Sequence, residues 1–229
     1  MRRIPHIIIE LLVLLTVVAA TAPAQEIMTS SEYFKAVSDN YGTIEDYEAE
    51  ITITKGDEEL TGTLYYKSPN LLRINFTEPE DQVLTVNNDE LLLHLPQHHV
   101  VMKQELESHS EATLATMASS EGLQLLKNSY SIAFLDSPQL VPLEEDSDET
   151  VRKLQLEWRE PGEGFRQIIM SVNTDMMIRR MEGLTEDYEE FRFDFENIEI
   201  NQGIPSARFD YESPPSAYNI ENFLFTPEN

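Results

Sequence analysis

Four of the five histidines lie within one region of the chain, and imidazole is a common metal ligand and proton-transfer group. His94 lies on the polar side of an expected strand, His98 and His99 lie in the turn that follows, and His109 comes further on. No ligand pattern such as H-E-x-x-H accompanies them, and the chain has no cysteine. We therefore expect no metal site and interpret these histidines as exposed turn residues.

Acidic residues gather in a loop over residues 138–150 that is also rich in proline and serine. They lack the fixed ligand spacing and central glycine of an EF-hand loop, so we expect a solvated loop rather than a calcium site. The chain contains no G-x-S-x-G, no phosphate-binding glycine loop and no dinucleotide fingerprint. We therefore expect neither a catalytic residue nor a cofactor, and nothing supports a hydrolase.

The strongest pattern in the chain is an alternation of apolar and polar residues over residues 62–102, which predicts five short strands joined by turns. A period of two places one set of side chains on each face of a strand, so one face is expected to be apolar and the other to meet water. The apolar set is Leu64, Tyr66, Leu72, Ile74, Phe76, Leu84, Val86, Leu91, Leu93 and Leu95.

The rest of the chain predicts further strands and a few helices. A helix is expected over residues 31–39, and one or two short helices over residues 108–128, broken near Ser119 or Gly122. The second half repeats the strand pattern, with a bulge near Asn197 and a last strand that contains Phe209 and Tyr211. Roughly ten or eleven strands with short connections predict a mainly β, antiparallel fold.

Residues 1–24 have the features of a secretory signal peptide. Arg2 and Arg3 precede a short apolar run, and Ala22-Pro23-Ala24 matches a cleavage site. Residues 25–229 are then expected to form a single soluble domain without a lipid-attachment cysteine. The net charge of −26 would repel nucleic acid and anionic membrane surfaces.

The central stretch resembles the LolA-like family of periplasmic carriers of outer-membrane lipoproteins. The family pattern runs G-x-L-aromatic-x-K-R-P-(N/G)-x-(L/F)-R-aromatic, continues with P-(D/E), and ends in a further hydrophobic strand and a proline. The positions that fit it are Gly62, Leu64, Tyr65, Lys67, Pro69, Asn70, Leu72, Arg73, Pro79, Glu80, Leu84 and Val86. The chain departs from the family pattern at one position. The family places an arginine directly before the proline, and this chain has Ser68 there.

The resemblance implies an incomplete antiparallel β-barrel with a helical lid, whose apolar face binds acyl chains. The apolar set given above is then the expected binding face, and Leu114, Met117 and Leu123 are the expected lid residues. The implied partners are an acylated lipoprotein or lipid cargo, an inner-membrane ATP-driven release complex and an outer-membrane acceptor. In the family the arginine holds the lid closed, so Ser68 predicts weaker or different closure, for which Lys67 and Arg73 are substitute candidates. The implied carrier is a periplasmic monomer.

Two alternatives remain open at this point. A relative of the same fold could carry free lipids for another exporter, or a structural or sensory β domain with a filled core could bind protein partners. Several methionines bear on the choice, because flexible thioethers suit a surface for variable apolar ligands but also fill gaps in an ordinary core. They are Met102, Met117, Met170, Met176, Met177 and Met181.

Overall fold

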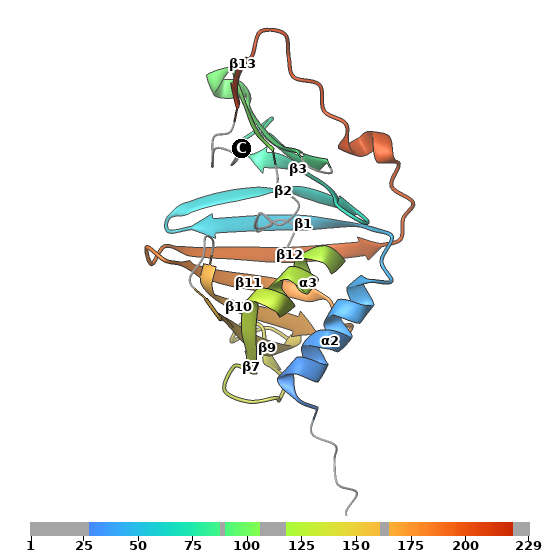
Figure 1. The fold of residues 1–229 in the computed structure, drawn as a ribbon, viewed down its shortest axis with the longest axis vertical. Helices are drawn as coiled ribbons and strands as arrows, with labels where there is room; N and C mark the ends of the chain where they lie inside the picture. Colours follow the sequence, from blue (N-terminus) through green and yellow to red (C-terminus); the bar gives the residue numbers. More distant parts are fainter. Residues whose placement is uncertain (1–27, 88–89, 106–117, 161–164, 222–229) are drawn as a thin grey trace, which may run out of the picture.

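The computed structural model describes residues 28–87, 90–105, 118–160 and 165–221, and thirteen strands within them form one sheet (Figure 1). The strand order is β13-β6-β5-β4-β3-β2-β1-β12-β11-β10-β9-β7, with β8 also paired to β9. The strands are β1 (Asp46–Lys55), β2 (Glu58–Lys67), β3 (Leu71–Glu78), β4 (Val83–Asn87), β5 (Glu90–Leu95), β6 (Val100–Glu105), β7 (Tyr130–Phe134), β8 (Val141–Pro142), β9 (Thr150–Trp158), β10 (Phe165–Asn173), β11 (Ile178–Thr185), β12 (Glu190–Ile200) and β13 (Tyr218–Glu221).

The sheet curves but does not close, because β13 and β7 lie at its two ends and no hydrogen-bonded pair joins them among the described residues. This confirms the expected mainly β, unclosed architecture. The expected number of strands was too low, because β8 and β13 are too short to show an alternation. The expectation of a last strand at Phe209 and Tyr211 was wrong, since Ser206–Phe209 forms a 3-10 helix, η3.

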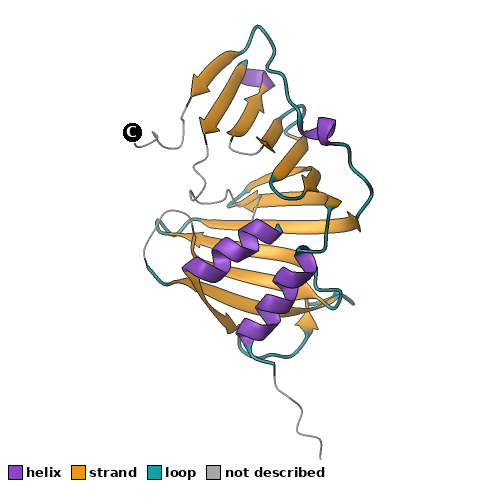
Figure 2. Ribbon diagram, turned by 45° about the vertical axis from the view of Figure 1, so that its right-hand side comes forward, coloured by secondary structure: helices purple, strands orange, loops and turns teal. Residues whose placement is uncertain are grey.

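Within the described residues, two α-helices pack on one face of the sheet. α2 (Ser30–Tyr41) begins with a capping box, in which the Thr29 hydroxyl accepts from the Glu32 N–H and the Glu32 carboxylate accepts from the Thr29 N–H. α3 (Ser120–Ser129) begins at the N-cap Ser119, whose hydroxyl accepts from the Gly122 N–H at 3.0 Å. Figure 2 shows both helices lying across the half of the sheet that contains β12, β11, β10, β9 and β7.

The hydrophobic core lies between these helices and the sheet. Tyr33, Phe34 and Val37 of α2 and Leu123 of α3 are almost completely buried there. From the strands come Leu154, Leu156, Ile168, Met170, Val172, Ile178, Met181, Phe193 and Phe195. The side chains of α2 and α3 therefore fill the space over this half of the sheet. Met170, Met177 and Met181 belong to this packed core, and Met102 lies elsewhere on the sheet.

Residues 201–217, here called the strap, run from the end of β12 to β13 along the right side of Figure 1. η3 within the strap packs against β3 and β4, and Phe209 is 1% exposed. The outward face of these strands therefore does not simply meet water, as the alternation predicted. Thr85, Leu92 and Val101 on that face are buried. The expected bulge near Asn197 is present, since the register shifts between Glu48 and Glu50 opposite it.

Candidate functional site

The ten apolar residues expected to form the binding face all lie on one face of the sheet. The register places Tyr66, Leu72, Val86 and Leu91 in one row across β2 to β5. A second row contains Leu64, Ile74, Leu84 and Leu93 and continues to Met102 on β6. Phe76 and Leu95 extend these strands in the same period of two. That this face binds acyl chains stays a prediction.

Burial falls along this face from the middle of the sheet toward β6. Leu64, Tyr66, Leu72, Ile74, Phe76, Val86 and Leu91 are buried, between 0% and 7% exposed. The side chains nearer the end of the sheet are only partly buried. They are Leu84, Leu93, Leu95, Val100 and Met102, here called the edge patch. The apolar face is thus continuous, but only the edge patch is partly accessible to solvent.

Gly62 allows β2 and β3 to approach each other closely at the start of this face. A Cβ atom at this position would collide with the backbone oxygen of Asn75 and lie 2.9 Å from the Cα of Phe76. The ladder shifts register between Thr61 and Gly62, so the glycine lies at an irregularity that brings the two backbones together. Its place in the family pattern therefore has a steric reason in this fold.

A pair of tyrosines connects the apolar face to the beginning of α3. The rings of Tyr47 and Tyr66 lie 5.1 Å apart between their centroids. The Tyr47 hydroxyl donates to the carbonyl oxygen of Ala118 at 2.9 Å, and the Tyr66 hydroxyl donates to that of Pro69 at 3.0 Å. Burial raises the pKa of Tyr66, and hydrogen bonding with the side chains of Ser120 and Ser68 opposes the rise.

The expected lid is described only in part. Leu123 is fully buried in the core, where α3 packs over the sheet. Leu114 and Met117 lie outside the described residues. Ser68 is exposed at the end of β2, next to Tyr66. The position that the family fills with arginine therefore lies close to the start of α3.

Arg73 does not face the helices, which corrects the expectation that it replaces the missing arginine at the lid. It lies opposite Tyr65 and Thr85, on the outward face of β3. Its guanidinium donates to the carbonyl oxygens of Arg208 at 3.0 Å and Asp210 at 3.2 Å, both in the strap. Arg73 thus holds the strap on the outward face of β3. The other face of β3, with Leu72 and Ile74, belongs to the hydrophobic core.

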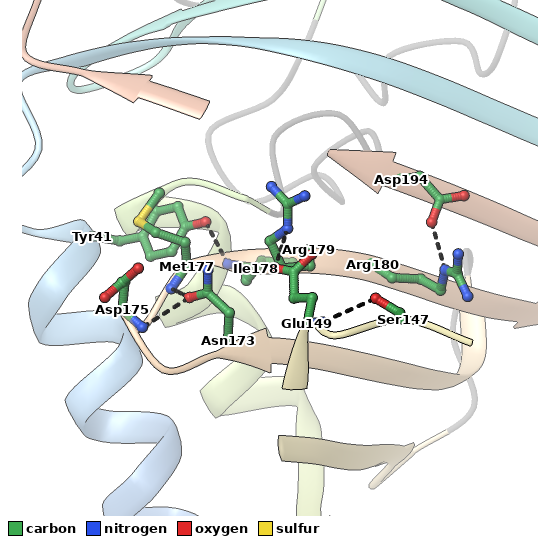
Figure 3. A network of polar contacts seen from close by, with 10 residues as sticks. All are labelled: Tyr41, Ser147, Glu149, Asn173, Asp175, Met177, Ile178, Arg179, Arg180 and Asp194. Atoms are coloured by element: carbon green, nitrogen blue, oxygen red, sulfur yellow. Dashed lines mark hydrogen bonds and ion pairs between the residues drawn. The ribbon is translucent and has the colours of Figure 1, made fainter. Parts of the chain in front are cut away.

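Polar contacts fix α2 to the turn between β10 and β11 (Figure 3). The Tyr41 hydroxyl accepts a hydrogen bond from the Ile178 N–H at 3.1 Å, and Asn40 donates to the carbonyl oxygen of Met176. Burial raises the pKa of the Tyr41 hydroxyl strongly. The helix over the packed half of the sheet is therefore secured by buried polar contacts as well as by apolar packing.

Part of the acidic loop and His94 contact neighbouring elements in the described structure. Glu149 pairs with Arg179 at 2.7 Å (Figure 3). Glu144 pairs with Arg180, so part of the acidic loop is tied to β11. The His94 ring lies against Tyr211 of the strap. Among the described residues, no group of three or more histidine, aspartate or glutamate side chains could hold a metal ion. His109 lies outside these residues.

Sequence reasoning missed several residues of this region. Tyr47 was expected only as a strand residue, although its phenol joins β1 to Ala118. Val100 and Met102 were expected in a strand but not as part of the binding face. Their alternation is the signal that could have included them, since β6 continues the rows of β5.

No helix in the described part of the chain is long and apolar enough to cross a membrane.

Comparisons with known proteins agree with this architecture. No curated protein sequence matches the chain. An uncharacterized conserved protein from Thermus thermophilus has a similar fold, with a TM-score of 0.54 and 14% identity over 83% of this chain and 97% of that one. The MucA/MucB complex from Pseudomonas aeruginosa gives a TM-score of 0.49 at 8% identity, over 83% of this chain and 63% of that one. At 14% identity the likeness to the Thermus thermophilus protein concerns the fold alone.

The family comparison rests on the sequence and covers most of the sheet. The model described as outer membrane lipoprotein carrier protein LolA matches residues 51–212, from β1 to the strap. This is more than half of the 229 residues, and it includes the apolar face, Gly62 and Ser68. The chain therefore belongs to the outer membrane lipoprotein carrier protein LolA family.

Proposed function

We propose that the protein is a carrier that binds the acyl chains of lipoproteins or lipids on the apolar face of its unclosed sheet. The observation that carries the proposal is the edge patch. Its partly exposed side chains continue, row by row, into the buried residues of β2 and β3. Each buried methylene contributes about 0.8 kcal/mol, so about five methylenes placed there contribute about 4 kcal/mol.

The buried part of the face would be reached in a second step. Leu84, Leu93 and Leu95 are accessible in the described structure, whereas the other seven expected binding residues are buried. An acyl chain would first contact the edge patch and then extend toward Leu72 and Ile74 as the elements over them move. Reversible binding of this kind needs a conformational equilibrium, which suits a carrier that must release its cargo.

The cellular setting follows from the family and from the expected signal peptide, which lies outside the described residues. Residues 1–24 would direct the chain to the periplasm and be removed, leaving residues 25–229 as the carrier domain. Cargo would come from an inner-membrane ATP-driven release complex and pass to an outer-membrane acceptor. The strong negative charge would keep the carrier from adhering to anionic bilayers during transfer.

A second candidate function is a protein-binding β domain with a filled core. The observation that favours it is the packed half of the sheet, where Val37, Leu123, Leu154 and Met170 are all 0% exposed. No space for an acyl chain remains around such side chains without movement. This candidate predicts that the edge patch contacts a partner protein rather than a lipid.

Native mass spectrometry of the full chain secreted into a bacterial periplasm, with lipid extraction alongside, tests the proposal. A co-purifying acylated species that a competing acyl ligand displaces would support the carrier. A bare protein that also refuses an acylated peptide would overturn it in favour of the filled-core domain.

Two neighbouring positions of β4 provide a matched pair of variants. Leu84 and Val83 are both partly buried, but consecutive strand residues point to opposite faces. Leu84→Asn should weaken acyl binding about tenfold, equivalent to about 1.4 kcal/mol, whereas Val83→Asn should leave it within about twofold. Equal effects of the two substitutions would contradict the assignment of the binding face.

A further inference from the structure

β13 is a short, weakly held strand at one end of the sheet. It has four residues, all exposed, with Tyr218 71% and Ile220 36% accessible to solvent. It pairs with β6 in parallel, whereas every other strand pair in the described residues is antiparallel. Short parallel pairing without buried side chains contributes little stability. β13 can therefore leave the sheet at a small cost in free energy.

β6 does not depend on β13 for its own place. It pairs with β5 over six residues, from Leu95 opposite Val100 to Glu90 opposite Glu105. Val101 and Gln104 of β6 are both 0% exposed. Departure of β13 would thus leave an ordered strand whose outer backbone N–H and C=O groups are free to pair with another extended chain.

The strap does not need to move with β13. Its beginning is held by Asp46, whose carboxylate accepts from the N–H groups of Gln202, Gly203 and Ile204. Its middle is held by Arg73 at Arg208 and Asp210. From there to β13 the backbone bonds outside the strand ladder are Ala217 to Pro214 and Tyr218 to His99.

The edge of β6 lies directly beside the edge patch. Ile220 of β13 is opposite Met102, which is opposite Leu93, which is opposite Leu84. β13 therefore adds Ile220 to the same row of the apolar face. On the other face Glu221 lies opposite Lys103, a cross-strand pair of opposite charge.

We propose that β6 is a docking edge for the extended polypeptide that follows an acylated residue, and that this segment binds by replacing β13. With the acyl chains on the edge patch, the attached polypeptide begins next to β6, because β6 forms the rim of the patch. Main-chain hydrogen bonds to β6 would supply affinity, and an apolar side chain in the place of Ile220 would supply specificity. The inference rests on the proposed function and narrows its cargo to acylated polypeptides.

A reversible lock on β13 tests this inference. The chain has no cysteine, so Lys103→Cys with Glu221→Cys introduces one pair at directly opposite positions, on the face away from the edge patch. The probes are a fluorescent peptide with an amino-terminal diacylglyceryl cysteine, and a fluorescent diacylglycerol without a peptide. In the oxidised form the affinity for the acylated peptide should fall about tenfold and that for diacylglycerol should stay within about twofold. Reduction should restore peptide binding.

The outcomes separate this inference from the proposed function. Peptide binding that is the same in the oxidised and reduced forms would overturn the docking edge and leave the carrier standing. An equal loss for both probes would also overturn it, since β13 would then gate acyl chains rather than compete with polypeptide. If the unmodified chain bound neither probe, the carrier itself would fail. A control pair, Thr54→Cys with Glu59→Cys on β1 and β2, should bind both probes unchanged.

Amide hydrogen exchange gives a second measurement that needs no substitution. Binding of the acylated peptide should slow exchange in Val100–Glu105 and speed it in Tyr218–Glu221, whereas diacylglycerol should leave Tyr218–Glu221 unchanged. Slower exchange in both strands with the peptide would contradict replacement of β13.

Discussion

The hydroxyl of Tyr47 on β1 donates a hydrogen bond to the carbonyl oxygen of Ala118, at 2.9 Å and across 71 residues of sequence. Both residues are almost completely buried, at 2% exposure each. Ala118 directly precedes Ser119, the N-cap of α3. This single bond therefore joins the middle of the sheet to the start of the helix that packs over it.

Removing the Tyr47 hydroxyl should loosen that junction. Tyr47→Phe keeps the ring but leaves the buried Ala118 carbonyl without its tyrosine donor, which should cost about 1–3 kcal/mol in the free energy of unfolding. Urea unfolding measures this loss, and amide exchange should speed up in Ser120–Ser129. Tyr188→Phe, at a side chain 71% exposed, is the control and should change neither. An unchanged unfolding midpoint for Tyr47→Phe would show that the bond does not secure α3.

The family arginine can be restored at Ser68. The guanidinium of Ser68→Arg would reach further than the serine hydroxyl, toward the start of α3 beside Tyr66 and Ser120. We expect slower release of a fluorescent acyl ligand in stopped-flow dilution. Ser68→Lys is the matched control, because it adds the charge without the planar fork and should slow release less. The same release rate for serine, lysine and arginine would rule out a closing role for this position.

The sequence predicts the sheet well because alternation is a local signal. Leu64, Leu72 and Val86 could be assigned to one face from their own strands, and the register confirms that they share it. The bulge near Asn197 was also visible, as a change of phase between Phe195 and Ile198. Each of these features depends only on neighbours along the chain.

What the sequence could not predict depends on contacts between distant residues. Nothing near Arg73 indicates that it would hold Arg208 and Asp210, since Arg73 and Arg208 are 135 positions apart in the sequence. The strap buries Phe209 in a 3-10 helix, although its spacing from Tyr211 is that of a strand. The methionines are a similar case. Whether a methionine fills the core or lies on an accessible face depends on where the helices pack, and the period of a strand carries no information about that packing.

Arg73 should control the strap without affecting the apolar face. Arg73→Ala removes donors to two strap carbonyl oxygens, so amide exchange over residues 204–217 should become faster, and stability should fall by about 1 kcal/mol. Binding of an acyl ligand should stay within about twofold, because Arg73 lies on the opposite face from Leu72 and Ile74. Arg73→Lys should give exchange rates and a stability between those of Arg73→Ala and those of the unmodified chain. Loss of acyl binding in Arg73→Ala with an unchanged strap would contradict this assignment.

Asp46 should be the strongest single anchor of the strap. It is 1% exposed, and its carboxylate accepts from three backbone N–H groups while lying 3.7 Å from Lys67. Asp46→Asn keeps the shape but turns one acceptor into a donor and removes the charge, which should cost about 2–3 kcal/mol in urea unfolding. The exposed Asp57→Asn is the control with the same chemical change. Similar midpoints for the two variants would show that the strap is held mainly by apolar packing.

Alkaline pH should destabilise the fold through its buried tyrosines. Burial raises the pKa of Tyr41 and Tyr47 well above the ordinary value of about 10, and the two phenols lie close together. Below about pH 10 both folded and unfolded chains keep these protons, so they add no pH dependence. Above it the unfolded chain ionises first, and the free energy of unfolding should fall by up to about 1.4 kcal/mol per pH unit for each tyrosine.

Urea midpoints measured from about pH 8 to about pH 11.5 test this expectation. Tyr47→Phe should start from a lower midpoint that does not change with pH below about pH 10, and its decline above that pH should be shallower than that of the unmodified chain, because one buried phenol no longer titrates. Tyr41→Phe should behave similarly, although it also removes the acceptor for the Ile178 N–H and so starts from a lower stability. A decline of the same steepness in all three proteins would show that groups other than these phenols cause the alkaline loss.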